Sequence, residues 1–303
     1  MLLLLTLSVS FASEGPWTTA PGRSNVYIGL GYETFSEFCS GACLVGGTDQ
    51  NSNELPTAVN KTYVNVFWRY GLSPKWDIAL DAPVAIVWTD EDLAGDAFAT
   101  TKAPGIIQAR ARYQFVKQGE VPVSAALRFG ARAGVLHFES RNRLTNVGEG
   151  STDIGAQVSV GRSGLTRVGG LIWSVDAGYW MRGYPGRSEI SDYNGQRVPR
   201  NELAASSTVM LQPTGPVGFI LAADGFYRTG GRAFSEPEWD TGSQWAELNA
   251  AQVKAGGRVM IFPTAYTPNM SVGFMYSIWA KNNPSNDWVV DLGVGFDFGR
   301  GAK

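Results

Sequence analysis

Hydrophobic and polar residues alternate one by one along most of this chain, from residue 25 to residue 298. The alternation comes in runs of roughly ten residues, and the connections between the runs are alternately short and long. A period of two places successive side chains on opposite faces of a β-strand. We find no convincing amphipathic helix between the runs. The pattern predicts twelve strands, at residues 25–32, 63–70, 75–88, 107–115, 123–135, 153–160, 171–182, 202–212, 217–228, 251–261, 269–278 and 287–298.

The run at residues 75–88 shows the two faces most clearly. Ile78, Leu80 and Val84 share one face, whereas Asp77 and Asp81 share the other. In a soluble sheet the apolar face would be the core and the charged face the surface. In an outer-membrane barrel the apolar face contacts lipid and the charged face lines the lumen.

The tryptophans of this run favour the barrel. Trp76 and Trp88 lie on the apolar face, and a tilted strand separates them by about 30 Å along the membrane normal, which is close to the interval between two aromatic girdles. A soluble sandwich does not require that interval. The predicted girdle residues are Trp68, Trp76, Trp88, Trp173, Trp288 and Phe298.

The connection lengths orient the predicted barrel. Short connections follow every second strand, and long ones, such as residues 34–60 and 185–200, follow the others. Outer-membrane barrels have short periplasmic turns and long extracellular loops, and an even number of strands returns both termini to the periplasm. We therefore predict an all-β fold: a twelve-stranded antiparallel transmembrane β-barrel with short periplasmic turns and long extracellular loops, in a Gram-negative outer membrane.

The first twelve residues read as a secretory signal. They form an apolar run that ends in small residues, with a cleavage site after Ala12. We predict a signal peptide at 1–12, a periplasmic N-terminal segment at 13–23, the transmembrane barrel at 24–298 and a C-terminal tail at 299–303. A short buried helix is the alternative for residues 1–12.

Composition agrees with an all-β fold and excludes other classes. The chain has 37 glycines, 10 tryptophans, 11 tyrosines and 15 phenylalanines, which suits strands joined by tight turns. Its formal charge of −2 excludes a basic nucleic-acid-binding protein. Cys39 and Cys43 are the only cysteines and His137 is the only histidine, so a metal site lacks ligands. After export we expect a disulfide between Cys39 and Cys43.

The polar faces predict a charged barrel interior. The arginines of residues 107–115 lie beside those of residues 123–135, and aspartates lie on the neighbouring strand. The predicted pore-lining residues are Arg69, Asp77, Asp81, Arg110, Arg112, Arg128, Arg132, Asp176, Asp224, Arg228, Lys254 and Arg258. These charges either create a transverse field that orients polar solutes and favours anions, or neutralise one another and fill the interior as a plug. The connection at 34–60 is either an external cover or an inward constriction.

Three stretches resemble known outer-membrane proteins. The last strand, Asp291-Leu-Gly-Val-Gly-Phe-Asp-Phe298, is similar to the C-terminal assembly signal of bacterial outer-membrane barrels, although residues 299–303 follow it. The stretches at 69–83 (RYGLSPKWDIALDAP) and 148–155 (GEGSTDIG) resemble the outer-membrane proteins named for the MetA pathway of phenol degradation. The resemblance implies a barrel that contacts outer-membrane lipid and the barrel-assembly machinery, and passage of a small solute, aromatic or apolar.

Three functions remain open at this stage. The first is an outer-membrane channel or uptake protein that passes a small solute by passive diffusion, with no cofactor and no nucleic-acid partner. The second is a largely occluded barrel with a structural or surface-interaction role. The third is an outer-membrane lipolytic enzyme that uses His137, but the flanking residues form no activating context that we recognise. We therefore predict that the protein is not an enzyme, and the oligomeric state stays open.

Overall fold

The computed structural model describes most of the predicted strands and turns. The described residues are 15–39, 42–44, 52–89, 101–104, 106–119, 121–134, 151–167, 169–185, 201–213, 215–228, 251–261, 268–281 and 284–299. Within these ranges no helix is long and apolar enough to cross a membrane.

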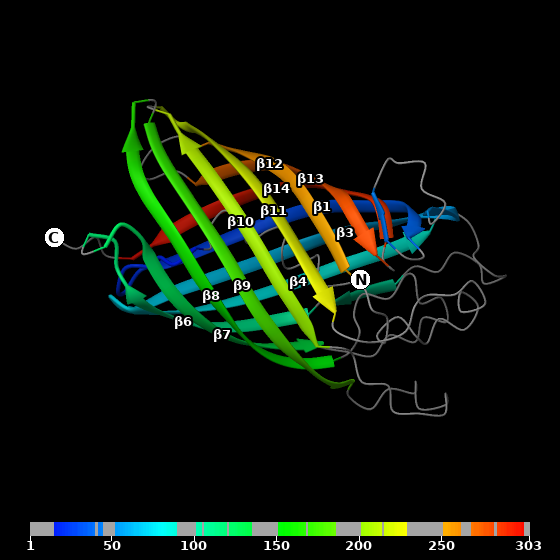
Figure 1. Ribbon diagram of the computed structural model, residues 1–303, viewed down its shortest axis with the longest axis horizontal. Helices are drawn as coiled ribbons and strands as arrows, with labels where there is room; N and C mark the ends of the chain where they lie inside the picture. Colours follow the sequence, from blue (N-terminus) through cyan, green and yellow to red (C-terminus); the bar gives the residue numbers. More distant parts are fainter. Residues whose placement is uncertain are drawn as a thin grey trace.

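Twelve long strands make up the wall of the molecule (Figure 1). They are β1 (Ser24–Cys39), β3 (Ser52–Ser73), β4 (Trp76–Thr89), β6 (Ile106–Val116), β7 (Ser124–Gly134), β8 (Ser151–Thr166), β9 (Gly169–Pro185), β10 (Glu202–Gln212), β11 (Val217–Arg228), β12 (Ala251–Ile261), β13 (Asn269–Lys281) and β14 (Pro284–Phe298). Two short strands, β2 (Ala42–Leu44) and β5 (Thr101–Pro104), pair with β13 and β4.

The wall closes on itself. Each long strand pairs antiparallel with its neighbours along the chain, and β1 pairs with both β3 and β14. The strand order runs from β12 through β1 and β14 to β13, and β12 also pairs with β13. The twelve strands therefore form a closed antiparallel barrel. Closure satisfies the backbone N–H and C=O groups that an open sheet leaves unpaired at its edges. The predicted fold class is confirmed.

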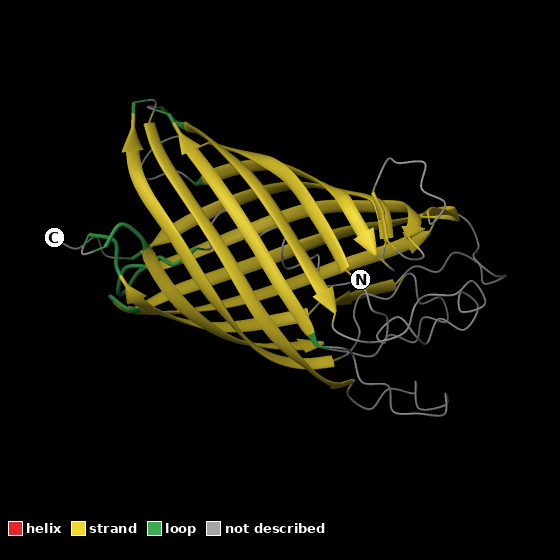
Figure 2. Ribbon diagram, viewed as in Figure 1, coloured by secondary structure: helices red, strands yellow, loops and turns green. Residues whose placement is uncertain are grey.

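The two ends of the barrel differ. At one end, which we call the turn end, short connections join β3 to β4, β6 to β7, β8 to β9 and β10 to β11 (Figure 2). At the opposite end, the loop end, the connections are longer, and much of them lies outside the described residues.

The strands β1 and β3 are longer than the sequence pattern predicts. We expected a connection at 34–60, but β1 continues to Cys39 and β3 begins at Ser52. Their pairing runs through Glu33↔Lys61 and continues past a register shift between Phe35 and Glu37. The side chains of Cys39 and Cys43 lie outside the described part, so their disulfide stays a prediction.

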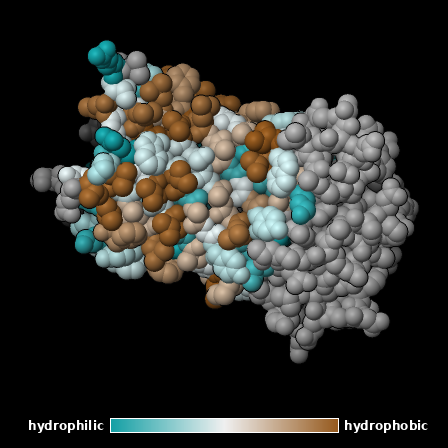
Figure 3. All heavy atoms as spheres, viewed as in Figure 1, coloured by the Kyte–Doolittle hydropathy of each residue, from teal (hydrophilic) through white to brown (hydrophobic). Residues whose placement is uncertain are grey.

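The two faces of the wall have the polarity that a lipid-facing barrel needs. Apolar side chains cover the outer face and are exposed, for example Leu30 at 49%, Val158 at 46% and Leu221 at 68% (Figure 3). Charged side chains point inward and are buried, for example Asp81 and Arg128. No second layer of protein packs on the outer face among the described residues, which excludes the soluble-sheet interpretation of the alternation.

Aromatic rings gather near both ends of the wall. Near the loop end, Tyr32 packs between Trp88 and Trp288, with ring centroids 6.3 and 5.4 Å apart. Near the turn end, the ring pairs are Trp68–Tyr70, Trp76–Tyr113 and Phe296–Phe298. Five of the six predicted girdle residues take part in these pairs. The sixth, Trp173, pairs across strands with Arg162 towards the turn end.

Residues 15–21, which we call the N-terminal strap, lie across the barrel interior at the turn end. The strap is tied to the wall where it meets β1, because the Gly22 N–H donates to the Gly71 carbonyl at 2.9 Å. From there it runs inward, so that Gly15 and Pro16 are buried. The hydropathy pattern predicts only a segment that precedes the barrel, and nothing in it predicts that this segment enters the barrel.

Candidate functional site in the barrel interior

The described interior is charge-balanced. Nine buried side chains are cationic: Lys61, Arg69, Arg110, Arg112, Arg128, Arg132, Arg228, Lys254 and Arg258. Nine are acidic: Glu33, Asp77, Asp81, Asp153, Asp176, Glu202, Asp224, Asp287 and Asp291. Burial of a charge is costly unless an opposite charge compensates it, so this balance is what a narrow interior requires.

Near the loop end, a lysine on β12 contacts two strands, β14 and β1, that are not neighbours of β12. The Lys254 ammonium contacts Asp287 at 2.5 Å and Glu33 at 3.0 Å, and Glu33 also contacts Lys61 at 2.7 Å. These residues come from β12, β14, β1 and β3, so the cluster spans β13 as well. It cross-links this side of the wall through the interior.

The other side of the loop end holds an arginine–glutamate–arginine group. Glu202 lies between Arg132 at 3.6 Å and Arg228 at 3.8 Å. The Arg132 guanidinium stacks on the Trp180 ring at 3.5 Å from its centroid, which is cation–π geometry. The Trp180 ring lies where a Cβ of Gly155 would be, so this glycine lets the ring lie flat against the wall.

The turn end is organised around two arginines on neighbouring strands. Arg128 donates to Asp176 at 2.6 Å and to the Ser159 hydroxyl, whereas Arg112 lies 3.6 Å from Asp77. Both arginines also donate to the carbonyl of Gly15, Arg112 at 2.6 Å and Arg128 at 3.4 Å. The strap is therefore held by the same guanidinium groups that pair with the wall carboxylates.

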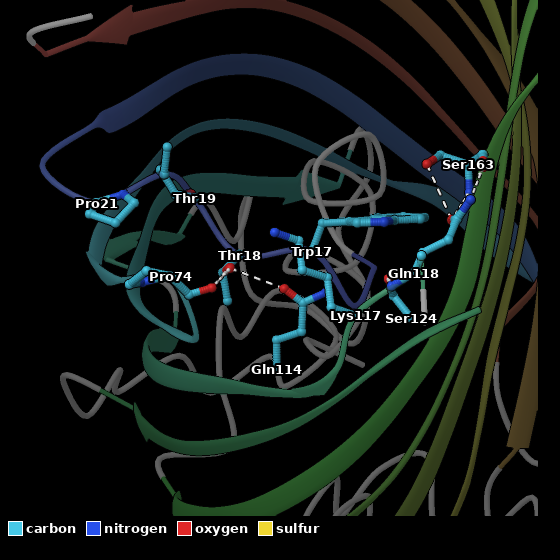
Figure 4. A pocket seen from close by; sticks show the side chains of 12 residues that line it. Trp17, Thr18, Thr19, Pro21, Pro74, Gln114, Lys117, Gln118, Ser124 and Ser163 are labelled. Atoms are coloured by element: carbon cyan, nitrogen blue, oxygen red, sulfur yellow. Dashed lines mark hydrogen bonds between the residues drawn. The ribbon is translucent and has the colours of Figure 1, made fainter. Parts of the chain in front are cut away.

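Further bonds fix the rest of the strap. The Arg112 Nη1 donates to the Trp17 carbonyl at 2.6 Å, and the Thr19 N–H donates to Asp77 Oδ2 at 2.9 Å. The Thr18 hydroxyl bridges the Pro74 carbonyl and the Gln114 side-chain oxygen (Figure 4). The strap thus follows the β3–β4 and β6 side of the mouth.

The Trp17 ring reaches the β8 side of the mouth. It rests against Gly161, where a Cβ would come within 2.9 Å of the ring. A larger residue at this position would push the indole away from the wall. Gly15, with φ of +117°, adopts a backbone conformation that favours glycine.

A cavity of about 550 Å³ remains between the strap and the wall. Figure 4 shows the strap forming one side of it. The strap residues that line it are Trp17, Thr18, Thr19, Ala20 and Pro21, and the wall residues are Pro74, Gln114, Lys117, Gln118, Gly119, Ser124 and Ser163. The cavity therefore lies between the strap and the turn-end parts of the wall.

The predicted pore-lining residues all have inward, largely buried side chains. The structure pairs Arg112 with Asp77, Arg110 with Asp81 at 3.7 Å, and Arg128 with Asp176. The arginines of β6 thus lie between the aspartates of β4 and the arginines of β7. Whether these side chains line an open path stays a prediction.

Sequence reasoning missed several interior charges. Glu33 and Lys61 lie just outside the predicted strands 25–32 and 63–70, and Glu202, Asp287 and Asp291 lie on polar faces to which the pattern gives no role. Their partners are distant in sequence, as in the contact of Arg258 with Asp291 at 2.6 Å. If the alternation is continued past Tyr32 in β1 and back before Tyr63 in β3, it places Glu33 and Lys61 on the inward face.

Other predicted features lie outside the described residues. His137 belongs to residues 135–150, so the structure does not describe its surroundings. Within the described ranges, no group of three or more His, Cys, Asp or Glu side chains is arranged to hold a metal ion.

Comparison with known proteins identifies the fold. A crystal structure of an outer membrane channel from Pseudomonas putida F1 matches 93% of this chain and 97% of its own, with a TM-score of 0.64 and 12% identity. The NanC porin matches 89% of this chain and 98% of its own, with a TM-score of 0.52 and 9% identity. The fold is that of bacterial outer-membrane barrels. No family model and no curated protein matches the sequence, so the resemblance to the phenol-degradation family stays a prediction.

Proposed function

We propose that this chain is an outer-membrane channel that passes a small solute by passive diffusion, past the N-terminal strap at the turn end. The observation that carries this proposal is the reversed polarity of the wall, with apolar residues outside and charged residues around the interior. A soluble barrel has no use for this arrangement, whereas a barrel that spans a bilayer requires it. The outer membrane channel and the NanC porin share this fold, which favours a channel. The turn end, where the strap meets β1 and where β14 ends, then faces the periplasm.

The first test concerns the bilayer. Leu30 lies near the middle of β1 with its side chain on the outer face, and it is half exposed. We expect Leu30→Arg to lower the free energy of unfolding in lipid vesicles by about 2–4 kcal/mol, because it places a charge among acyl chains. Urea titration followed by tryptophan fluorescence measures this loss. Leu30→Ala is the matched control and should lose less; an equal loss in both variants would argue against a lipid-facing wall.

The second test concerns passage itself. The purified full chain in planar bilayers should give discrete conductance steps in potassium chloride, because a path past the strap connects the two sides. The absence of conductance steps at every voltage would favour the alternative of an occluded barrel. The buried, paired charges of the interior are the observation that favours that alternative.

The interior arginines should set the ion preference. Arg110→Ala together with Arg128→Ala leaves Asp81 and Asp176 without these partners, so the interior gains net negative charge. We expect the ratio of anion to cation permeability to fall roughly fivefold. Reversal potentials in a salt gradient measure this ratio independently of pore size. Arg162→Ala removes an exposed arginine from the outer face of β8 and should leave the permeability ratio unchanged. An equal fall in this variant would show that the interior arginines do not set the ratio.

A further inference from the structure

Two arginines inside the barrel hold uncharged backbone oxygens. Arg112 and Arg128 lie on the neighbouring strands β6 and β7 and face each other in register. Both donate to the Gly15 carbonyl, and Arg112 donates to the Trp17 carbonyl as well. The side chains are almost completely buried, at 3% and 2% exposure. Two converging guanidinium groups can bind a carboxylate, and on the side that faces the strap they hold neutral oxygens.

A carboxylate would bind these groups more strongly than the strap does. Hydrogen bonds from guanidinium to an ionised oxygen are roughly twice as strong as those to a neutral carbonyl, and a carboxylate can accept two parallel bonds from one arginine. The strap makes up for this with bonds elsewhere, from Thr19 to Asp77 and from Thr18 to Pro74. At the arginines themselves, a carboxylate can therefore replace the carbonyls of the strap.

The surroundings limit the charge and the size of the ligand. Asp77 and Asp176 already pair with the two arginines, so the group is neutral before a ligand binds. A single negative charge meets about half the repulsion from these two aspartates that a dianion such as phosphate meets, so the site favours a monoanion. Neither arginine lines the cavity of about 550 Å³, but Trp17, whose carbonyl Arg112 holds, does. Release of the strap would therefore join the space at the arginines to this cavity and leave room for a small molecule.

We propose that Arg112 and Arg128 form a binding site for a small monocarboxylate, and that its binding releases the strap from the arginine pair and widens the turn end. This inference rests on the proposed channel function. It makes the strap a gate that responds to the solute itself, because the same two side chains hold the closed strap and recognise the anion.

The test compares a carboxylate with its neutral amide. The full chain is reconstituted in planar bilayers in potassium chloride, and either propionate or propionamide is added at the same concentration. Propionate should raise the mean current several-fold at millimolar concentration, whereas propionamide, which has nearly the same size, should not. Equal responses to the two compounds would overturn the inference.

Three variants separate the site from the gate. Arg128→Lys keeps the charge but loses the planar fork, so about tenfold more propionate should be needed for the same rise. Arg112→Gln with Arg128→Gln should abolish the response to propionate and raise the current without propionate. The reason is that the arginine pair then holds neither the strap nor the anion. Arg162→Gln, on the outer face, should respond like the unchanged protein.

Deletion of residues 15–21 distinguishes failure of the inference from failure of the channel function. With the strap removed, the current should be high and insensitive to propionate. If the deleted variant conducts more than the full chain but the full chain ignores propionate, the inference is wrong and the channel stands. If the deleted variant retains the response to propionate, the strap is not the gate. If neither chain conducts, the channel function fails.

Discussion

Deletion of the N-terminal strap, residues 15–21, is expected to raise the single-channel conductance about threefold, because one chain segment takes up much of a mouth whose backbone radius is on the order of 12 Å. The strap crosses the mouth from Gly71 to the arginine pair, and a cavity of about 550 Å³ remains beside it. Conductance in planar bilayers measures the change, and reversal potentials show whether selectivity changes with it.

Point variants serve as controls for this deletion. Trp17→Ala removes the indole that rests on Gly161 but keeps the backbone bonds to Arg112, so it should give an intermediate conductance. Retention of the heat-dependent shift in gel mobility shows that each variant still forms a barrel. A folded deletion variant with unchanged conductance would mean that the strap does not obstruct the path.

The largest loss of stability is expected from Lys254→Met. Lys254 is buried between Glu33 and Asp287, and its removal leaves both carboxylates in the interior without their shared ammonium. Breaking a buried ion pair from one side costs about 3–5 kcal/mol. Urea-induced unfolding in lipid vesicles measures the loss.

A double variant tests the cause. Lys254→Met with Asp287→Leu removes both members of the shortest contact, while Glu33 keeps its bond to Lys61 at 2.7 Å. We expect the double variant to be more stable than Lys254→Met alone, because fewer buried charges lack a partner. Additive losses in the two single variants and the double variant would show that the lysine acts through packing and not through its charge.

The strands and their faces were predictable because a period of two is a local property. The alternation of Asp77 and Asp81 with Ile78 and Leu80 predicts which side chains point inward without reference to any distant residue. The structure confirms this assignment. The same rule failed beyond Tyr32, because Phe35 is apolar but points inward, and the alternation of polarity stops there although the strand continues.

The strap was not predictable, for a different reason. Its contacts join residues far apart in the chain, such as Gly15 with Arg112 and Thr19 with Asp77. Gly, Pro, Trp and Thr carry no charge pattern that matches the arginines, and the bonds use backbone carbonyls that every residue has. Only the folded barrel brings these groups together.

The position of the strap also constrains how the barrel is assembled. The strap leads directly into β1, and β1 forms the seam with β14, the last strand of the chain. The barrel cannot close until β14 pairs with β1, so the first strand of the wall stays unpaired on one edge until the last strand is in place. Whichever machinery inserts the wall must therefore keep the free edge of β1 accessible until β14 arrives to pair with it.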